Sequence, residues 1–164
     1  MTVLGIDPGL ATMGWGVLRS ENGRYEVIDY GVVTTPKELS LPKRLEVLEA
    51  GVNQLFEKFK PDEVALEELF FNTNITTGIN VAHARGVILL TSSKNCERLF
   101  EYTPLQIKQA LTGYGRAEKL QIMAMVKTLL RLDKVPRPDD AADALAVALT
   151  HCQTNRLSGG FGIK

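Results

Sequence analysis

Two apolar segments of this chain each end on a carboxylate, and this arrangement restricts the folds open to it. "TVLGID" ends on Asp7, and "EVALEE" ends on Glu67 and Glu68. Between them, apolar side chains repeat every three or four residues from Leu41 to Phe59, which predicts a helix. A helix between two strands implies a crossover, so the two strands are expected to lie parallel in one sheet.

The segments next to the first strand predict an antiparallel meander. "GWGVLR" and "RYEVIDYGVVTT" have the composition of two further strands, and Pro8 and Gly9 supply the turn after the first. Strands this close in sequence usually pair as neighbours. In the helix that follows, Ser40 is the candidate N-cap and Pro42 suits the first turn, while Pro61 ends the helix.

The second half of the chain is mainly helical. Helices are expected over residues 74–92, 104–112, 117–132 and 139–153, with a short strand over residues 98–104. The whole order predicts one domain over residues 1–153, an α/β fold in which helices cover both faces of a mixed sheet. The glycine-rich segment 154–164 is expected to be a flexible tail.

Charge is unevenly distributed along a chain whose net charge is zero. Between Pro104 and Arg137, seven lysines and arginines face two acidic residues, so one end of the molecule is expected to be basic. That region is either a solvated helix surface or a surface for nucleic acid. No apolar run has membrane-spanning length and no signal peptide is recognised, so we expect a cytoplasmic protein with Cys96 and Cys152 reduced.

Acidic residues gather where this fold would place a site. Asp7 and Glu67 end neighbouring parallel strands, and sites in open α/β sheets form beyond the carboxyl ends of strands. Asp7 has the alternative role of binding turn amides. Glu68 is expected to face solvent, because successive side chains of a strand alternate in direction.

A second acidic group opens the last helix, in "PDDAADALAVAL". Asp140 and Asp143 share one helix face, and so do Asp139 and Asp143. Asp139 or Asp140 has the alternative role of capping the helix, and for Asp139 we prefer that role. The alanines between the acids allow the helix to lie close to a sheet. Converging carboxylates repel one another unless a cation intervenes, and oxygen ligands without His or Cys suit Mg²⁺ or Mn²⁺.

Five motifs then occur in a fixed order: "GIDPG", "ALEELF", "Q-IK-A", "G-G-AEK" and "DDAADALA". Together they resemble the RuvC family of bacterial Holliday-junction resolvases, over residues 3–151. The resemblance implies a ribonuclease-H-like fold with a five-stranded mixed sheet. It also implies a homodimer that nicks two strands of a four-way DNA junction symmetrically, and RuvA and RuvB as partner proteins.

The same resemblance assigns roles to individual residues. It implies that Asp7, Glu67, Asp140 and Asp143 are the catalytic metal ligands. The implied cofactor is Mg²⁺, which Mn²⁺ can replace, with two ions per site when substrate is bound.

DNA contacts are expected from a further group of residues. Lys108 and Lys119 match family positions linked to DNA, and Phe70 matches a position that stacks on junction bases, although a phenylalanine there is also a candidate for the core. Arg116 lies in a glycine-containing loop that can approach a phosphate. His151, like His83, is expected to be structural.

A stripe of small residues marks the helix predicted over residues 74–90. Gly78, Ala82 and Gly86 recur at every fourth position. We expect this stripe, with Ile75 and Ile79, to form the dimer interface, because small residues let a partner helix approach closely. The alternative is that the stripe packs on the protein's own sheet.

Three other functions compete with junction resolution. A nuclease of the RuvC-like YqgF type would act in RNA processing, but such chains lack the paired "AEK" and "DAADALA" motifs. An actin-like nucleotide-binding fold would need a second domain, for which 164 residues leave no room. A DNA-binding module without catalysis is disfavoured because uncompensated carboxylates would repel DNA.

Overall fold

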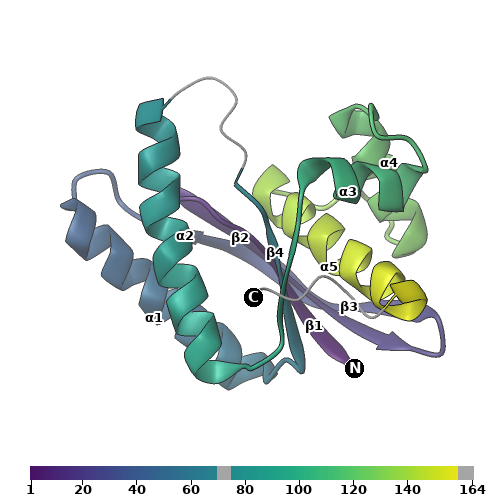
Figure 1. The fold of residues 1–164 in the computed structure, drawn as a ribbon, viewed down its shortest axis with the longest axis horizontal. Helices are drawn as coiled ribbons and strands as arrows, with labels where there is room; N and C mark the ends of the chain where they lie inside the picture. The colour runs from purple at the N-terminus through teal and green to yellow at the C-terminus, as the bar shows by residue number, and fades with distance from the viewer. Residues whose placement is uncertain (70–74, 159–164) are drawn as a thin grey trace.

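The fold is built on a five-stranded mixed sheet, seen in a computed structural model that describes residues 1–69 and 75–158 (Figure 1). The strands lie in the order β3-β2-β1-β4-β5. Their bounds are β1 (Thr2–Asp7), β2 (Thr12–Glu21), β3 (Arg24–Thr34), β4 (Glu63–Glu67) and β5 (Leu99–Tyr102). β1 to β3 form an antiparallel meander, while β4 lies parallel to β1 and β5 parallel to β4. The predicted meander and crossover are therefore confirmed.

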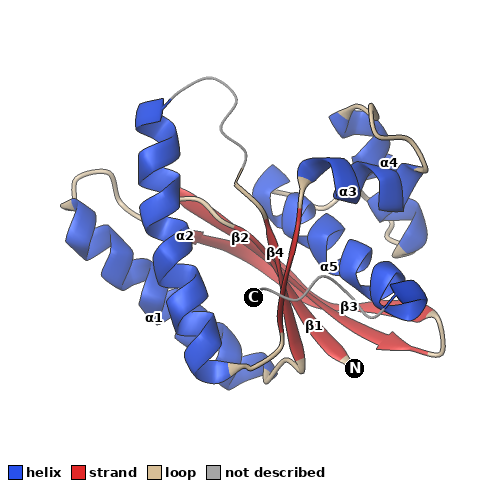
Figure 2. Ribbon diagram, viewed as in Figure 1, coloured by secondary structure: helices blue, strands red, loops and turns tan. Residues whose placement is uncertain are grey.

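Helices cover both faces of this sheet, as predicted (Figure 2). Their bounds are α1 (Leu41–Phe59), α2 (Ile75–Asn95), α3 (Pro104–Thr112), α4 (Lys119–Leu129) and α5 (Asp139–Ser158). α1 and α2 lie on one face, and α5 lies on the other with α3 and α4 packed outside it. α5 runs five residues beyond its predicted end, so the start of the expected tail is helical, and residues 159–164 lie outside the described part.

Contacts at the helix ends explain where α4 begins and where α1 ends. α4 begins two residues late, after Glu118, because the Gln121 side chain accepts from the backbone amide of Glu118 at 2.8 Å and the Gln121 amide donates to the Glu118 carbonyl oxygen at 3.0 Å. α1 begins after Ser40 as predicted, although its hydroxyl makes no capping hydrogen bond. α1 ends where Lys60 adopts a left-handed conformation directly before Pro61.

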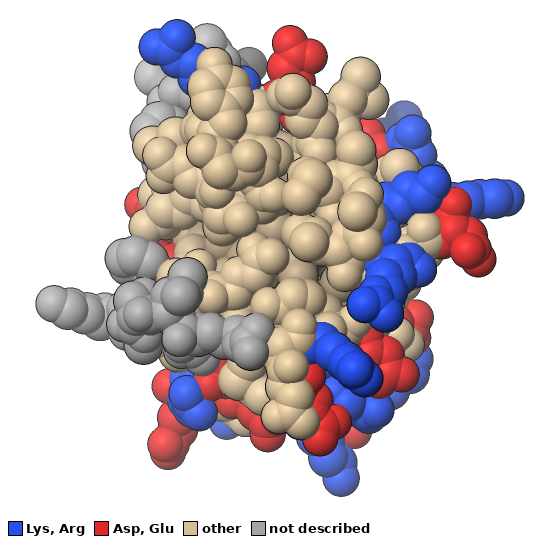
Figure 3. Space-filling view, turned by 90° about the vertical axis from the view of Figure 1, so that its right-hand side faces the viewer, with Lys and Arg blue, Asp and Glu red and all other residues tan. Residues whose placement is uncertain are grey.

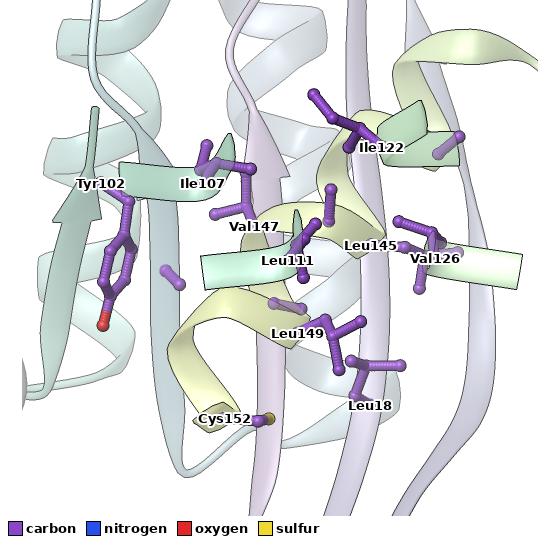
Figure 4. Close-up of a cluster of buried hydrophobic side chains, with 14 of the residues drawn as sticks. Leu18, Tyr102, Ile107, Leu111, Ile122, Val126, Leu145, Val147, Leu149 and Cys152 are labelled. Carbon is purple, nitrogen blue, oxygen red and sulfur yellow. The ribbon is translucent and has the colours of Figure 1, made fainter. Parts of the chain in front are cut away.

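Two hydrophobic cores lie on opposite sides of the sheet. On the α1 and α2 side, Leu4 and Ile6 of β1 pack with apolar residues of both helices. On the α5 side, Val3 packs with α3, α4 and α5, and Figure 4 shows Leu145 and Leu149 of α5 among these side chains. Strand residues at odd positions of β1 thus face α5, because side chains alternate along a strand.

Glycines allow α5 to lie directly on the sheet. A methyl group on Gly5 of β1 would come within 2.2 Å of the Ala144 carbonyl oxygen, and one on Gly14 of β2 within 1.9 Å of the Asp140 carbonyl oxygen. Any side chain at either position would displace the helix. The close approach expected from the alanines of α5 therefore depends equally on glycines of the strands beneath it.

Within the described ranges, no helix has the length and apolar character needed to cross a membrane.

Candidate active site

The ends of β1 and β4 bring two carboxylates together on the α5 side of the sheet. The strands run parallel with Ile6 beside Leu66, so Asp7 and Glu67 follow at matching positions. Ile6 and Leu66 point toward α1 and α2, which leaves Asp7 and Glu67 pointing toward α5. Glu68 follows the strand, and its backbone amide donates to the Tyr102 carbonyl oxygen at 2.9 Å. Glu68 is half-buried and lines the same cleft as Asp7 and Glu67, so it is not the solvent-facing side chain that we expected.

The first turn of α5 supplies the other two acids. Asp140 lies against β2, where its backbone oxygen abuts Gly14, and Asp143 lies one turn further along the helix. The Pro138 carbonyl accepts from the amides of Ala141 and Ala142, so the helix begins on this backbone group. Asp139 does not take the capping role that we preferred for it, because its carboxylate pairs with Arg137.

Electrostatics show that the acids form one group. Burial, followed by the charges of Glu67, Asp143 and Asp140, raises the pKa of Asp7 to about 8. Burial and then the charge of Asp143 raise the pKa of Glu67 to about 7, although a side-chain hydrogen bond from Asp7 lowers it. Burial also raises the pKa of Asp143. Burial and mutual repulsion therefore disfavour charge on Asp7 and Glu67 together.

Two lysines flank the acids, at the positions predicted from the sequence. Lys119 Nζ donates to Asp143 Oδ2 at 2.9 Å and lies 3.8 Å from Asp139 Oδ2. These contacts raise the pKa of Lys119. Lys108 on α3 lines a small cleft of about 70 Å³ together with Glu67 and Asp143. The structure therefore brings both lysines to the acidic group.

The acidic group fits a divalent cation by its chemistry. Among residues 1–69 and 75–158, no three acidic, His or Cys side chains already have the arrangement of a metal site. One ammonium group already lies among the acids, where Lys119 donates to Asp143. A cation with oxygen ligands would satisfy the same carboxylates. A cleft of about 210 Å³ lined by Asp7 and Glu67 opens this group to the surface.

Comparison with known proteins agrees with this arrangement. The family model described as crossover junction endodeoxyribonuclease RuvC matches residues 3–151. A crossover junction endodeoxyribonuclease RuvC of Alkaliphilus oremlandii is 52% identical over 164 residues, all of both chains. The chain belongs to the RuvC family.

Solved structures of RuvC confirm the predicted ribonuclease-H-like fold. The Thermus thermophilus RuvC structure superposes with a TM-score of 0.92 at 34% identity, covering 99% of this chain and all of that one. T. thermophilus RuvC in complex with a Holliday junction substrate superposes with a TM-score of 0.90 at 32% identity, with the same coverage.

Of the other two expected DNA contacts, the structure describes only Arg116. Arg116 is exposed in the loop between α3 and α4. Phe70 lies outside the described residues.

A buried polar network behind the RuvC acids was not foreseen. Glu63 and His151 have no exposed surface, and His151 Nε2 lies 2.5 Å from Glu63 Oε2. A carboxylate only accepts, so Nε2 carries the proton and Nδ1 accepts from the Tyr102 hydroxyl at 2.7 Å. Arg98 pairs with the other oxygen of Glu63. His151 is structural, as predicted, and a carboxylate at the start of an otherwise apolar strand was the available signal for its partner.

Proposed function

We propose that this RuvC-family protein resolves Holliday junctions by paired, symmetric, metal-dependent nicking of DNA during recombination and repair. The observation that carries the proposal is the convergence of Asp7, Glu67, Asp140 and Asp143 from two strand ends and one helix. The RuvC family model covers nearly the whole chain and supports this function over the YqgF alternative. Such a protein acts where the chromosome lies, in the cytoplasm.

Mg²⁺, with Mn²⁺ as a substitute, is the proposed cofactor, with two ions per site once substrate is bound. When bound, the ions activate water and stabilise the leaving oxygen of an in-line displacement at phosphorus. Asp7 and Glu67, whose pKa values are raised, would hold an ion in their deprotonated forms. Asp140 and Asp143, fixed on the rigid first turn of α5, would complete the ligand set.

Lysines at the rim hold the DNA strand against these acids. Lys119 now donates to Asp143, and a cation bound by that carboxylate would release the ammonium group toward a phosphate. Lys108 lies on the other side of Glu67 and would contact the same strand. Arg116, exposed nearby, and Phe70 are proposed as further DNA contacts. Backbone contacts of this kind supply affinity without reading sequence.

A homodimer formed through α2 would set the spacing of two active sites. Ala82 is exposed, and a methyl group on Gly86 would meet no atom within 4 Å. Ile79 is 51% exposed and Leu90 57% exposed on the same helix. The small-residue stripe therefore does not pack on its own sheet, which removes the alternative weighed from the sequence. A two-fold dimer uses one such patch twice and gives paired nicks on a symmetric junction.

RuvA and RuvB are proposed as partners that act with it on the junction.

The catalytic proposal is tested on a synthetic mobile four-way junction beside a linear duplex of the same sequence. We expect symmetric nicks in the junction with Mg²⁺, and neither nicks without metal nor comparable cutting of the duplex. Equal cutting of both substrates would contradict junction selectivity, and cutting that persists with chelator would contradict the metal.

The dimer is tested by sedimentation at micromolar concentration. Wild type is expected to sediment as a dimer and Ala82→Arg as a monomer, because the arginine would stand in the contact. A matched arginine on the opposite layer, Thr128→Arg on exposed α4, should remain dimeric. A monomeric wild type would contradict the dimer, and a dimeric Ala82→Arg would place the interface elsewhere.

A further inference from the structure

A groove runs along the outer side of α4, next to the acidic group but separate from it. Its volume is about 620 Å³, within the range of about 300–1,000 Å³ typical of ligand pockets. One wall is α4 and the other is the segment that leads from α4 into α5. Neither the paired acids nor Lys108 lines it.

The groove has an apolar floor. Leu120, Met123 and Val135 contribute to its lining, at helical spacing on α4 and from the segment opposite. Leu120 is 80% exposed, which is the largest exposure among the large apolar side chains of the described residues. A leucine held in water beside a concave surface provides a contact for an apolar part of a ligand.

The rim of the groove is cationic. Lys119, Lys127 and Arg137 line it together with one acid, Asp139, which already pairs with Arg137 and lies 3.8 Å from Lys119 Nζ. Figure 3 faces the side of the molecule that carries α3 and α4, and Lys and Arg side chains gather there along one edge of a broad uncharged surface. A ligand with negative charge at its edge and an apolar body matches this groove.

The groove is continuous with the proposed active site through Lys119. The same ammonium group that lines the groove donates to Asp143 at 2.9 Å. A DNA strand whose phosphate lies at the acids would therefore pass a cation that belongs to both sites. A nucleotide has the required chemistry, since its phosphate is anionic and its base is flat and largely apolar on its faces.

We infer that this groove binds a nucleotide flanking the scissile phosphate on the cut strand. Lys127 and Arg137 hold its backbone phosphates, and its base packs against Leu120. The groove then contributes to which sequences are cut, because the fit of the base on the apolar floor adds to the binding of that strand. The inference rests on the proposed function for its substrate, and the binding measurements below separate the two.

The charge contribution is tested by the salt dependence of junction binding without Mg²⁺. Lys127→Ala is expected to lower the slope of log affinity against log salt by about one. Lys58→Ala removes the same charge from the end of α1 on the opposite layer, where Lys58 pairs with Asp29, and should leave the slope unchanged. An unchanged slope for Lys127→Ala would overturn the phosphate contact.

The base contact is tested with fixed junctions in which single nucleotides beside the scissile phosphate are made abasic. Wild type should bind about fivefold more weakly when one particular flanking base is absent, as expected for losing the cover of one leucine. Leu120→Ser should bind the intact junction and the junction without that base with equal affinity. Its thermal stability should be unchanged. Leu39→Ser, at an exposed loop residue before α1, should discriminate as wild type does.

The outcomes separate the groove from the catalytic proposal. The contrary result is that wild type binds the intact junction while Leu120→Ser still binds the abasic junction more weakly than the intact one. In that case the groove does not hold a nucleotide, and a protein partner becomes the alternative occupant. If wild type does not bind the junction at all, the proposed function fails first.

Discussion

Strand β4 carries a glutamate at each end, and the two side chains point to the same face of the sheet. Glu63 lies at its start, fully buried, where Arg98 and His151 contact its two oxygens. Glu67 lies at its end, where burial and the charge of Asp143 raise its pKa to about 7. The carboxylate of Glu63 is matched by donors on both oxygens, whereas that of Glu67 lies among other acids and its charge is only partly compensated by Lys119.

The difference separates a structural acid, Glu63, from the acid that we propose to be catalytic, Glu67. A buried charge is tolerated when hydrogen bonds and opposite charge compensate it, as at Glu63. Around Glu67 and Asp7 the compensation is incomplete, which costs stability and leaves the ligand set ready for a cation. The contrast predicts opposite consequences for substitutions only four residues apart.

The largest effect should follow from removing the catalytic charge. Glu67→Gln is expected to lower the single-turnover nicking rate in Mg²⁺ by about ten-thousandfold, about 5.4 kcal/mol of barrier, while junction binding stays near normal. Glu63→Gln is the matched control and should nick within about tenfold of wild type at a temperature where it is folded. Near-normal nicking by Glu67→Gln would remove it from the site.

The next effect concerns folding. Glu63→Leu should lower the free energy of unfolding by about 3–5 kcal/mol in urea, because it leaves Arg98 and His151 without their acceptor. Adding His151→Leu to the same chain should recover part of the loss, since an apolar pair leaves fewer polar groups unpaired. If Glu63→Leu were as stable as wild type, the network would contribute nothing to folding.

The acidic group should give metal binding a pH dependence. Below their raised pKa values Asp7 and Glu67 retain protons, so a cation must displace them, and nicking at subsaturating Mg²⁺ should rise as pH increases from 6 to 8. The expected gain is up to about tenfold per pH unit for each displaced proton. Saturating Mg²⁺ should flatten the profile. A profile independent of Mg²⁺ concentration would contradict competition between protons and metal.

The smallest effect is a gain in stability. Asp7 binds its proton more tightly when folded than when unfolded, so the metal-free protein should lose stability as pH rises from about 4 to about 8. The lowered pKa of His151 acts with the opposite sign below about pH 6.5, so the loss from Asp7 is best measured between about pH 6.5 and 8.5. Asp7→Asn should therefore be more stable than wild type by about 1–2 kcal/mol at pH 8.5 without metal, as measured by urea unfolding. A less stable variant would contradict like-charge repulsion at Asp7.

Much of the fold was predictable because local patterns determine it. The alternation in β1 and β4, the helix periodicity from Leu41 to Phe59 and short connections led to the sheet order and the crossover. Alternation did not decide between Glu67 and Glu68, because both line the cleft beside Asp7. Membership of the RuvC family was predictable because five motifs keep their order along the chain.

Contacts between distant segments were not predictable in the same way. Asp139 was assigned to a cap because local preference favours it, but Arg137 and Lys119 compete for its carboxylate. His151 lies 88 residues from Glu63, and no periodicity links the two positions. The α4 groove likewise depends on how the segment before α5 folds back, which composition does not encode.

The glycines beneath α5 carry a consequence for the evolution of this enzyme. A side chain at Gly14 would push against the backbone of Asp140, and one at Gly5 against the backbone of Ala144, so the helix would lift from the sheet and carry two acids away from the other two. A saturation screen scored by survival of DNA damage should therefore find these glycines as intolerant of replacement as the carboxylates. Any descendant of this chain that keeps the activity should therefore keep glycine at positions 5 and 14, although neither residue takes part in the chemistry.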